Sequence, residues 1–294
     1  MKPKYLLLLV LLLVASIAFA QGGLFSQPPQ AETPNDNSST TPILTVHFID
    51  VGQGDSIFIQ GPKCVLIDGG VRDKGGAVVS YLQSLNVTRI DYVVATHPDA
   101  DHIGGLIDVL GSFNASCAPT VIESGATSAT VTYQYYLSAL QGREVINASR
   151  GMIFTISEGI NFTVYSPVQP IVSTDLNENS VVIKLCVFNV SFLFTGDAGF
   201  ATEEGMLASS LDLYSNVLKV GHHGSASSSS NVFLEAVSPS ISVVSVGASN
   251  RYGHPAPETI GRITSAGSAI YRTDLDGTVT IATDGDQLTV RTQK

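Results

Sequence analysis

Short runs of apolar, mostly β-branched residues recur along this sequence and constrain its fold more than any other feature. Most of these runs are apolar at successive rather than alternate positions, which is typical of strands in sheets that are covered on both faces. The runs predict strands at 43–50, 56–60, 64–68, 90–96, 160–165, 181–188, 192–195, 217–220 and 241–246.

Stretches in which apolar residues recur with helical spacing alternate with the predicted strands. They predict helices at 77–85, 103–110, 133–140, 202–207, 232–237 and 257–265, and a closing hairpin of 278–283 and 287–292. Alternating strands and helices pack in layers, and the polar residues that follow the strands then gather along the sheet edges. The sequence therefore predicts a layered α/β domain with its functional site at a sheet edge.

The first 42 residues are predicted to lie outside this domain. Lys2 and Lys4 precede an apolar run at 5–19, and Ala-Phe-Ala at 18–20 forms a cleavage site, so we expect a signal peptide at 1–20. An uncleaved membrane anchor is the alternative, although the run is shorter than the ~20 residues of a spanning helix. Residues 21–42 have the composition of a disordered linker, which leaves 43–294 for one large or two small domains.

Six Asn-x-Ser/Thr sequons support export, because they would accept N-glycans on the outer face of a cell. They begin at Asn37, Asn86, Asn114, Asn147, Asn161 and Asn189. The alternative is that a sequence rich in Ser and Thr contains such matches by chance. We expect a secreted or otherwise extracytoplasmic glycoprotein.

Three cysteines, Cys64, Cys117 and Cys186, are too few for a disulfide scaffold. Cys64 and Cys186 lie in apolar strand-like runs and are predicted as core residues, with one disulfide left open. The formal net charge of −10, which loss of Lys2 and Lys4 would make about −12, excludes a broadly basic surface. It argues against a stable nucleic-acid complex, but not against phosphodiester hydrolysis at a site where bound cations supply positive charge.

Five of the six histidines follow strand-like runs directly, in polar or Gly-rich turns. These five are His97, His102, His222, His223 and His254. Their placement predicts that they converge on one site. The sixth, His47, lies within a strand-like run and is predicted as an ordinary strand residue.

The segment 96–105 carries four potential metal ligands within six residues, between a predicted strand and a predicted helix. His97 and Asp99 can face one cation, and Asp101 and His102 can face a second. The alternative is a solvated turn in which an Asp caps the helix. The segment resembles the metal-binding motif of the metallo-β-lactamase superfamily, with Asp99 where many members have a second His. This resemblance, over about 44–292, implies a four-layer αββα sandwich and a metal-dependent hydrolase.

Further segments are similar to elements of that superfamily. Asp68, after the strand-like run 65–67, resembles the carboxylate that orients the metal-binding loop, and Asp197 resembles the carboxylate that bridges two metals. Residues 219–225 offer the last metal-binding His. Because adjacent residues of an extended segment point in opposite directions, only one of His222 and His223 is expected as a ligand. The other would face the substrate or support a metal ligand from behind, and Ser225 is a candidate substrate contact.

A narrower resemblance, to the metallo-β-lactamase-like domain of ComEC-type competence proteins, lies in 48–56, 177–182 and 251–255. It implies a nuclease that acts on DNA, although no apolar run after the signal peptide reaches spanning length for a channel. Asp50, Gln53 and Asp55 are expected in supporting roles at the rim of the site. Asn179 is a candidate substrate contact or, equally, a residue of a turn. Asp99 and the segment 176–179 replace histidines of the β-lactamases, which argues against β-lactam hydrolysis.

The resemblance implies two divalent metal ions, Zn²⁺ or Mn²⁺, bridged by Asp197 and by a water that attacks phosphorus. Asp101 would orient this nucleophile, and His254 would protonate the leaving group or bind a phosphate oxygen. The expected substrate is a phosphodiester, with single-stranded DNA as a candidate. Two alternatives remain open: a cell-envelope phosphodiesterase that resembles phosphorylcholine esterases, and a binding glycoprotein without catalysis.

Overall fold

The computed structural model describes residues 41–113, 119–171 and 173–294. The predicted signal peptide, nearly all of the linker, the sequons at Asn37 and Asn114, and Cys117 lie outside these residues and stay predictions. Within the described ranges, no helix is both long and apolar enough to cross a membrane.

The first sheet has eight strands among the described residues, and its second half, from β3 onward, is parallel. In spatial order the strands are β15 (Leu288–Thr292), β14 (Val279–Thr283), β1 (Leu44–Phe48), β2 (Ile57–Gln60), β3 (Val65–Ile67), β4 (Tyr92–Ala95), β5 (Thr120–Glu123) and β6 (Val145–Asn147). Successive parallel strands are connected by helices, so the carboxyl ends of β3 and β4 lie at the same edge.

The second sheet has seven strands in the part of the chain that the structure describes. Their order is β13 (Ala269–Arg272), β12 (Ile241–Val244), β11 (Val217–Lys219), β10 (Val190–Phe194), β9 (Val182–Val187), β8 (Ile160–Ser166) and β7 (Ile153–Ser157). The strands from β10 to β13 are parallel, so polar residues that follow β10 and β11 come together at one edge.

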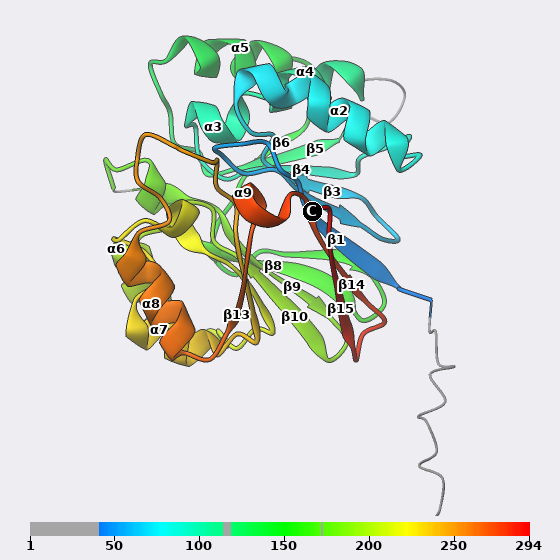
Figure 1. Ribbon diagram of the computed structural model, residues 1–294. Helices are drawn as coiled ribbons and strands as arrows, with labels where there is room; N and C mark the ends of the chain where they lie inside the picture. The colour runs from blue at the N-terminus through cyan, green and yellow to red at the C-terminus, as the bar shows by residue number, and fades with distance from the viewer. Residues whose placement is uncertain (1–40, 114–118, 172) are drawn as a thin grey trace, which may run out of the picture. The chain divides into compact units, whose positions relative to one another are not determined.

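Three apolar clusters hold the layers together. The inner faces of the two sheets share one cluster, in which Phe48 of β1 meets Phe194 of β10. A second cluster joins the outer face of the first sheet to helices α2 (Gly75–Ser84), α4 (Leu106–Ser112) and α5 (Val131–Ala139). A third joins the second sheet to α6 (Phe200–Leu207), α7 (Asn231–Val237) and α8 (Pro257–Ser265). The predicted four-layer αββα sandwich is confirmed (Figure 1).

The single helix predicted at 103–110 is wrong. The chain forms a short helix α3 (Ala100–Ile103), breaks at Gly104 and Gly105, and resumes as α4. The backbone amide of Gly105 donates to the carbonyl of Gly70 rather than within a helix, and a Cβ at Gly105 would lie 1.9 Å from the carbonyl oxygen of Gly69. Close packing of two backbones, which needs glycine, therefore interrupts the helix beside the site.

Candidate metal centre

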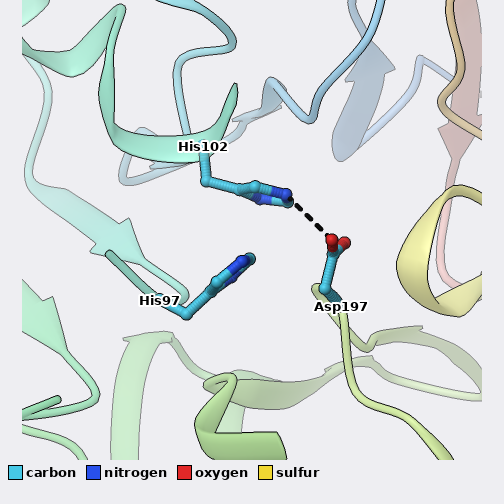
Figure 2. Close-up of side chains that lie close together, drawn as sticks. All are labelled: His97, His102 and Asp197. Carbon is cyan, nitrogen blue, oxygen red and sulfur yellow. Dashed lines mark ion pairs between the residues drawn. The ribbon is translucent and has the colours of Figure 1, made fainter. Parts of the chain in front are cut away.

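The candidate site lies where both sheets present the carboxyl ends of parallel strands. His97, Asp101 and His102 follow β4 of the first sheet. Asp197 follows β10, and His223 follows β11, both in the second sheet. The structure thus brings together residues that lie more than 120 positions apart in the sequence. Figure 2 shows His97, His102 and Asp197 pointing toward one another.

His102 is held with one ring nitrogen toward the protein and the other toward the site. Its Nδ1 lies 2.7 Å from Asp68 Oδ2, and its Nε2 lies 3.3 Å from Asp197 Oδ2. Asp68 also accepts hydrogen bonds from the backbone amide of Thr96 at 2.9 Å and from its hydroxyl at 2.6 Å. A carboxylate that fixes the second nitrogen of a histidine is typical of metal sites, so Asp68 has the contacts predicted for an orienting residue.

His223 is positioned in the same manner by a backbone carbonyl. Its Nδ1 lies 2.9 Å from the carbonyl oxygen of Ser245, and its Nε2 lies 3.4 Å from both Asp101 Oδ2 and Asp197 Oδ2. The ring is buried. His223 is therefore better placed as a ligand than as the substrate contact that was the alternative for this pair.

The expectation that His222 and His223 point in opposite directions is wrong. Both residues have positive φ, 47° and 52°, in a short 3-10 turn η3 (Gly221–Gly224), and the alternation of an extended segment does not apply there. His222 Nε2 lies 3.7 Å from Asp197 Oδ2, and its side chain is 27% exposed. Both rings therefore face the same carboxylate, His223 from the buried side and His222 from the solvent side.

Asp197 is the meeting point of the imidazoles. Its Oδ2 lies within 3.7 Å of the Nε2 atoms of His102, His222 and His223. Its backbone amide donates to Ser180 Oγ at 3.1 Å, which fixes the turn that carries it. Burial alone raises the pKa of Asp197, but the positive charges of His223 and His102 lower that pKa well below its usual range. The carboxylate is therefore anionic and faces the ring nitrogens of three histidines.

Two buried atoms support the fit of a divalent cation. His97 Nε2 and Asp197 Oδ1 are buried and have no hydrogen-bond partner among the described residues. The other nitrogen of His97, Nδ1, lies 3.1 Å from Thr96 Oγ1. A buried donor or acceptor without a partner is costly, and a bound cation would supply a partner for both of these atoms.

The possible ligand atoms of the described residues form four overlapping groups, in each of which all atoms lie within 4.8 Å of one another. The groups are His97, His102 and Asp197; Asp101, His102 and His223; Asp55, Asp197 and His223; and Asp55, Asp68 and His102. The residues present thus fit a bound divalent cation. Asp99 is in none of the groups found among the described residues, and its half-exposed side chain lies 3.6 Å from His97 Nε2.

Asp55 lies deeper than the predicted rim position. Its carboxylate is 1% exposed and lies 2.7 Å from Lys219 Nζ and 3.4 Å from His223 Nδ1. Burial raises the pKa of Asp55, but Lys219 and His223 outweigh that effect and lower it. Lys219 also donates to the carbonyl oxygens of Val220 and Gly196, next to the His222–His223 turn and to Asp197.

Lys219 was not predicted from the sequence as part of the site. The signal that could have found it is a lone lysine inside an apolar strand directly before Gly-His-His-Gly. Thr96 and Ser180 were also missed, although both hydroxyls contact the ligand loops. Their signal is a polar residue at the end of a buried strand, next to a candidate ligand.

The remaining predicted residues lie farther out. Asn179 donates to the carbonyl oxygens of Ser173 and Asp175, which matches the alternative role in a turn. Asn177 instead approaches the site, with Nδ2 3.5 Å from His222 Nε2. Ser225 Oγ contacts Ser227 rather than a ligand.

Two of the three supporting residues predicted near the rim form hydrogen bonds or ion pairs with residues other than the candidate ligands. Asp50 accepts from the amide of Gly52 and lies 3.4 Å from Lys294 Nζ. Gln53 Oε1 accepts from the amide of Gly247, which ties the loop after β1 to the loop after β12. His254 lies on this second loop, and its ring centroid is 5.6 Å from that of His222. His47 contacts Tyr81 and Gln60 and lies outside the candidate ligand groups, as predicted.

Comparison with known proteins agrees with this geometry. The chain is 31% identical to competence protein ComA of Neisseria gonorrhoeae over 87% of its own length, and 29% identical to ComE operon protein 3 of Bacillus subtilis over 80%. It spans about a third of the length of these relatives, 33% and 32%. The similarity to ComEC-type proteins that the sequence suggested is confirmed.

The fold is also found among solved structures. The metallo-β-lactamase fold protein YhfI from Bacillus subtilis matches 78% of this chain and 95% of its own, with a TM-score of 0.52 and 10% identity. A family model described as the metallo-beta-lactamase superfamily matches residues 49–248, which include every candidate ligand. The chain therefore belongs to the metallo-β-lactamase superfamily.

Proposed function

We propose that this protein is an exported, binuclear metal-dependent hydrolase of phosphodiesters. The observation that carries the proposal is the position of Asp197, whose single oxygen Oδ2 faces the Nε2 atoms of three histidines. A carboxylate in that position can be shared by two cations. Divalent cations bound there would lower the pKa of a coordinated water and offset the negative charge that develops on a phosphoryl group.

The residues around the ligands support roles in hydrolysis. Asp101 Oδ2 contacts His223 Nε2 while its side chain is 26% exposed, so the same carboxylate can accept a hydrogen bond from a water on the open side. Burial alone raises the pKa of Asp101, but His223 and His102 lower it well below its usual range, which keeps it an acceptor. We assign Asp101 to the orientation of the attacking water.

His254 had two alternative roles, proton donor to the leaving group or contact to a phosphate oxygen. Burial and the nearby charges of His222 and His223 lower the pKa of His254. A ring that is neutral near pH 7 is a weak proton donor but can still donate an N–H hydrogen bond. This supports the contact to a phosphate oxygen.

Two further observations support a phosphodiester over a β-lactam as the substrate. Asp99 stands where many superfamily members have a second histidine, and Asn179 is engaged in its own turn. The names of two relatives, competence protein ComA and recombination protein 2 of Haemophilus influenzae, both refer to processes that involve DNA. We therefore favour nucleic acid, in particular a single strand, as the source of the phosphodiester.

The alternative of a cell-envelope phosphodiesterase is supported by the net charge of −10, which does not attract a polyanion.

Export is proposed from the segment 1–20, and N-glycosylation from sequons such as those at Asn86, Asn147 and Asn189, which are exposed in the structure. Zn²⁺ and Mn²⁺ both suit a mixed set of imidazoles and carboxylates.

The experiment that tests the proposal combines metal analysis with a substrate panel. We expect about two equivalents of divalent metal per chain, and hydrolysis of bis-p-nitrophenyl phosphate that exceeds hydrolysis of nitrocefin. Cleavage of single-stranded DNA but not of p-nitrophenyl phosphorylcholine would favour the nuclease over the envelope enzyme. Nitrocefin turnover without phosphodiester hydrolysis, or failure to take up any divalent metal, would overturn the proposal.

A further inference from the structure

The loop between β12 and α8 is a built structure beside the candidate metal centre. The side chain of Asn250 makes four hydrogen bonds within it: Nδ2 donates to the carbonyl oxygens of Gly247 and His254, and Oδ1 accepts from the amides of Tyr252 and His254. Gln53 anchors its first residues through Gly247. The loop is thus held in one shape, with Arg251 and Tyr252 exposed at its tip.

A row of flat side chains leads from this tip to the ligands. The Arg251 guanidinium lies 4.9 Å from the centroid of the Tyr252 ring and donates to the Tyr252 hydroxyl at 2.7 Å. The Tyr252 ring lies nearly parallel to that of His254, at 18° and 5.8 Å between centroids. The His254 ring in turn meets His222, which faces Asp197.

We propose that Arg251 and Tyr252 form a binding platform for a nucleobase of a single-stranded nucleic acid. The proposal rests on the proposed function and names the part of the substrate that lies next to the scissile phosphate. Tyr252 is 52% exposed, so its ring is accessible to a ligand next to the candidate metal centre. Exposed aromatic rings and arginine planes are the groups on which unpaired bases stack.

The charge of Arg251 favours this substrate over the alternatives. Arg251 is a solvent-exposed cation beside the candidate metal centre, in a chain whose net charge is −10. It can contact a phosphate of the flanking nucleotide while the plane of its guanidinium contacts a base. A quaternary ammonium headgroup such as choline binds aromatic rings without a competing cation, and Arg251 would repel it. The pair therefore suits a nucleotide better than a phosphorylcholine ester.

The first test compares two substrates that differ only in the group beside the phosphate. Thymidine 5′-(p-nitrophenyl phosphate) carries a base, and methyl p-nitrophenyl phosphate does not. In the metal-loaded protein, we expect Tyr252→Ala to lower kcat/KM for the thymidine ester about tenfold more than for the methyl ester, mainly through KM, while Tyr252→Phe retains most of the difference. Tyr135→Ala, at an exposed tyrosine of α5, is the control and should change neither.

The second test does not require turnover. The chain contains no tryptophan, so Tyr252→Trp introduces a single indole at the platform, and Tyr135→Trp provides the matched control. Thymidine 5′-monophosphate, which has no diester bond to cleave, should quench the indole of the Tyr252→Trp variant but not that of the control. Deoxyribose 5-phosphate, which lacks the base, should quench neither.

The two tests separate this inference from the proposed function. If the wild-type protein cleaves neither ester, the proposed function fails, and the quenching experiment still decides whether a base is bound. An equal loss on both esters in Tyr252→Ala, or no difference in quenching between thymidine 5′-monophosphate and deoxyribose 5-phosphate, would overturn the platform.

Discussion

Lys219 Nζ lies 2.7 Å from Asp55 Oδ2, and both side chains are almost completely excluded from solvent, with exposures of 0% and 1%. Removal of one member of such a pair leaves an uncompensated buried charge. We therefore expect Lys219→Met to lower the free energy of unfolding by ~3–5 kcal/mol, measured by urea denaturation of the metal-free protein.

The control for this prediction is Arg72→Met. The ion pair of Arg72 with Asp108 is as short, 2.6 Å, but its side chains are 50% and 35% exposed. Exposed pairs contribute about 0.2–1 kcal/mol, so the control should be nearly as stable as the wild type. A similar loss in both variants would mean that the burial of the Lys219 pair does not determine its effect.

The contact of Asp68 with His102 predicts that Asp68 affects metal affinity without itself contacting the metal. Asp68→Asn should weaken the hold on His102 Nδ1, and mutation of such orienting partners costs about 10–100-fold in metal affinity. The change is measured by competition with a chelating dye. Asp91→Asn removes a carboxylate that contacts the amide of Cys64, outside the candidate site, and should leave metal affinity unchanged. Unchanged affinity in Asp68→Asn would contradict the orienting role of Asp68.

Asp197→Ala should have the largest effect of any single ligand substitution, because its carboxylate belongs to two candidate groups, one with His97 and His102 and one with Asp55 and His223. We expect loss of at least one metal equivalent by elemental analysis, and a fall in phosphodiester hydrolysis by orders of magnitude. The fold should persist, since the core lies between the sheets. His47→Ala serves as the control, and near-normal activity of Asp197→Ala alongside an inactive His47→Ala would refute the site.

Metal uptake should release protons. Burial alone lowers the pKa of His102 and of His223, but the carboxylates around them, above all Asp197, raise both pKa values well above the usual value of 6.5. In the metal-free protein these rings therefore hold a proton to a higher pH than a free imidazole does, and a proton on Nε2 must leave before that nitrogen binds a cation. Calorimetry in buffers of different ionisation enthalpy should report a net release of protons on metal binding, and affinity should fall as the pH falls. Uptake without proton release would contradict this assignment.

The role of His254 can be tested with substrates that differ in their leaving group. If His254 contacts a phosphate oxygen, His254→Gln should slow esters of p-nitrophenol and of an aliphatic alcohol by similar factors. A proton donor would instead matter most for the alcohol, by about 10²–10⁴-fold, because its alkoxide is the poorer leaving group. The ratio of the two kcat values therefore distinguishes the roles, and a selective loss on the aliphatic ester would restore His254 as the acid.

The sequence predicted most central elements of the fold, because their strands are buried on both faces and read as continuous apolar runs. Three of the strands that were missed, β6, β7 and β13, lie at sheet edges, where few side chains are buried and the apolar pattern is weak. The short strand β5 was also missed, although its centre is buried. Edge strands depend on pairing with a neighbour, which local sequence does not encode.

For the site, residue type was more informative than local geometry. The motif at 96–102 and the turn at Asp197 identified the ligand candidates, because polar groups after buried strands have few structural uses. The orientation of His222 and His223 was not predictable from strand alternation, since both residues have positive φ in a turn between two closely packed glycines, Gly221 and Gly224. The depth of Asp55 depends on Lys219, which lies 164 positions away.

The candidate ligands come from both sheets, with His97 and His102 following β4, and Asp197 and His223 following β10 and β11. A cation bound between them therefore joins the two halves of the sandwich, and neither half can separate without its release. Each tenfold rise in free metal above the dissociation constant would then add ~1.4 kcal/mol to the free energy of unfolding. Metal supply would thereby set how long the folded chain survives proteolysis, as well as how fast it turns over substrate.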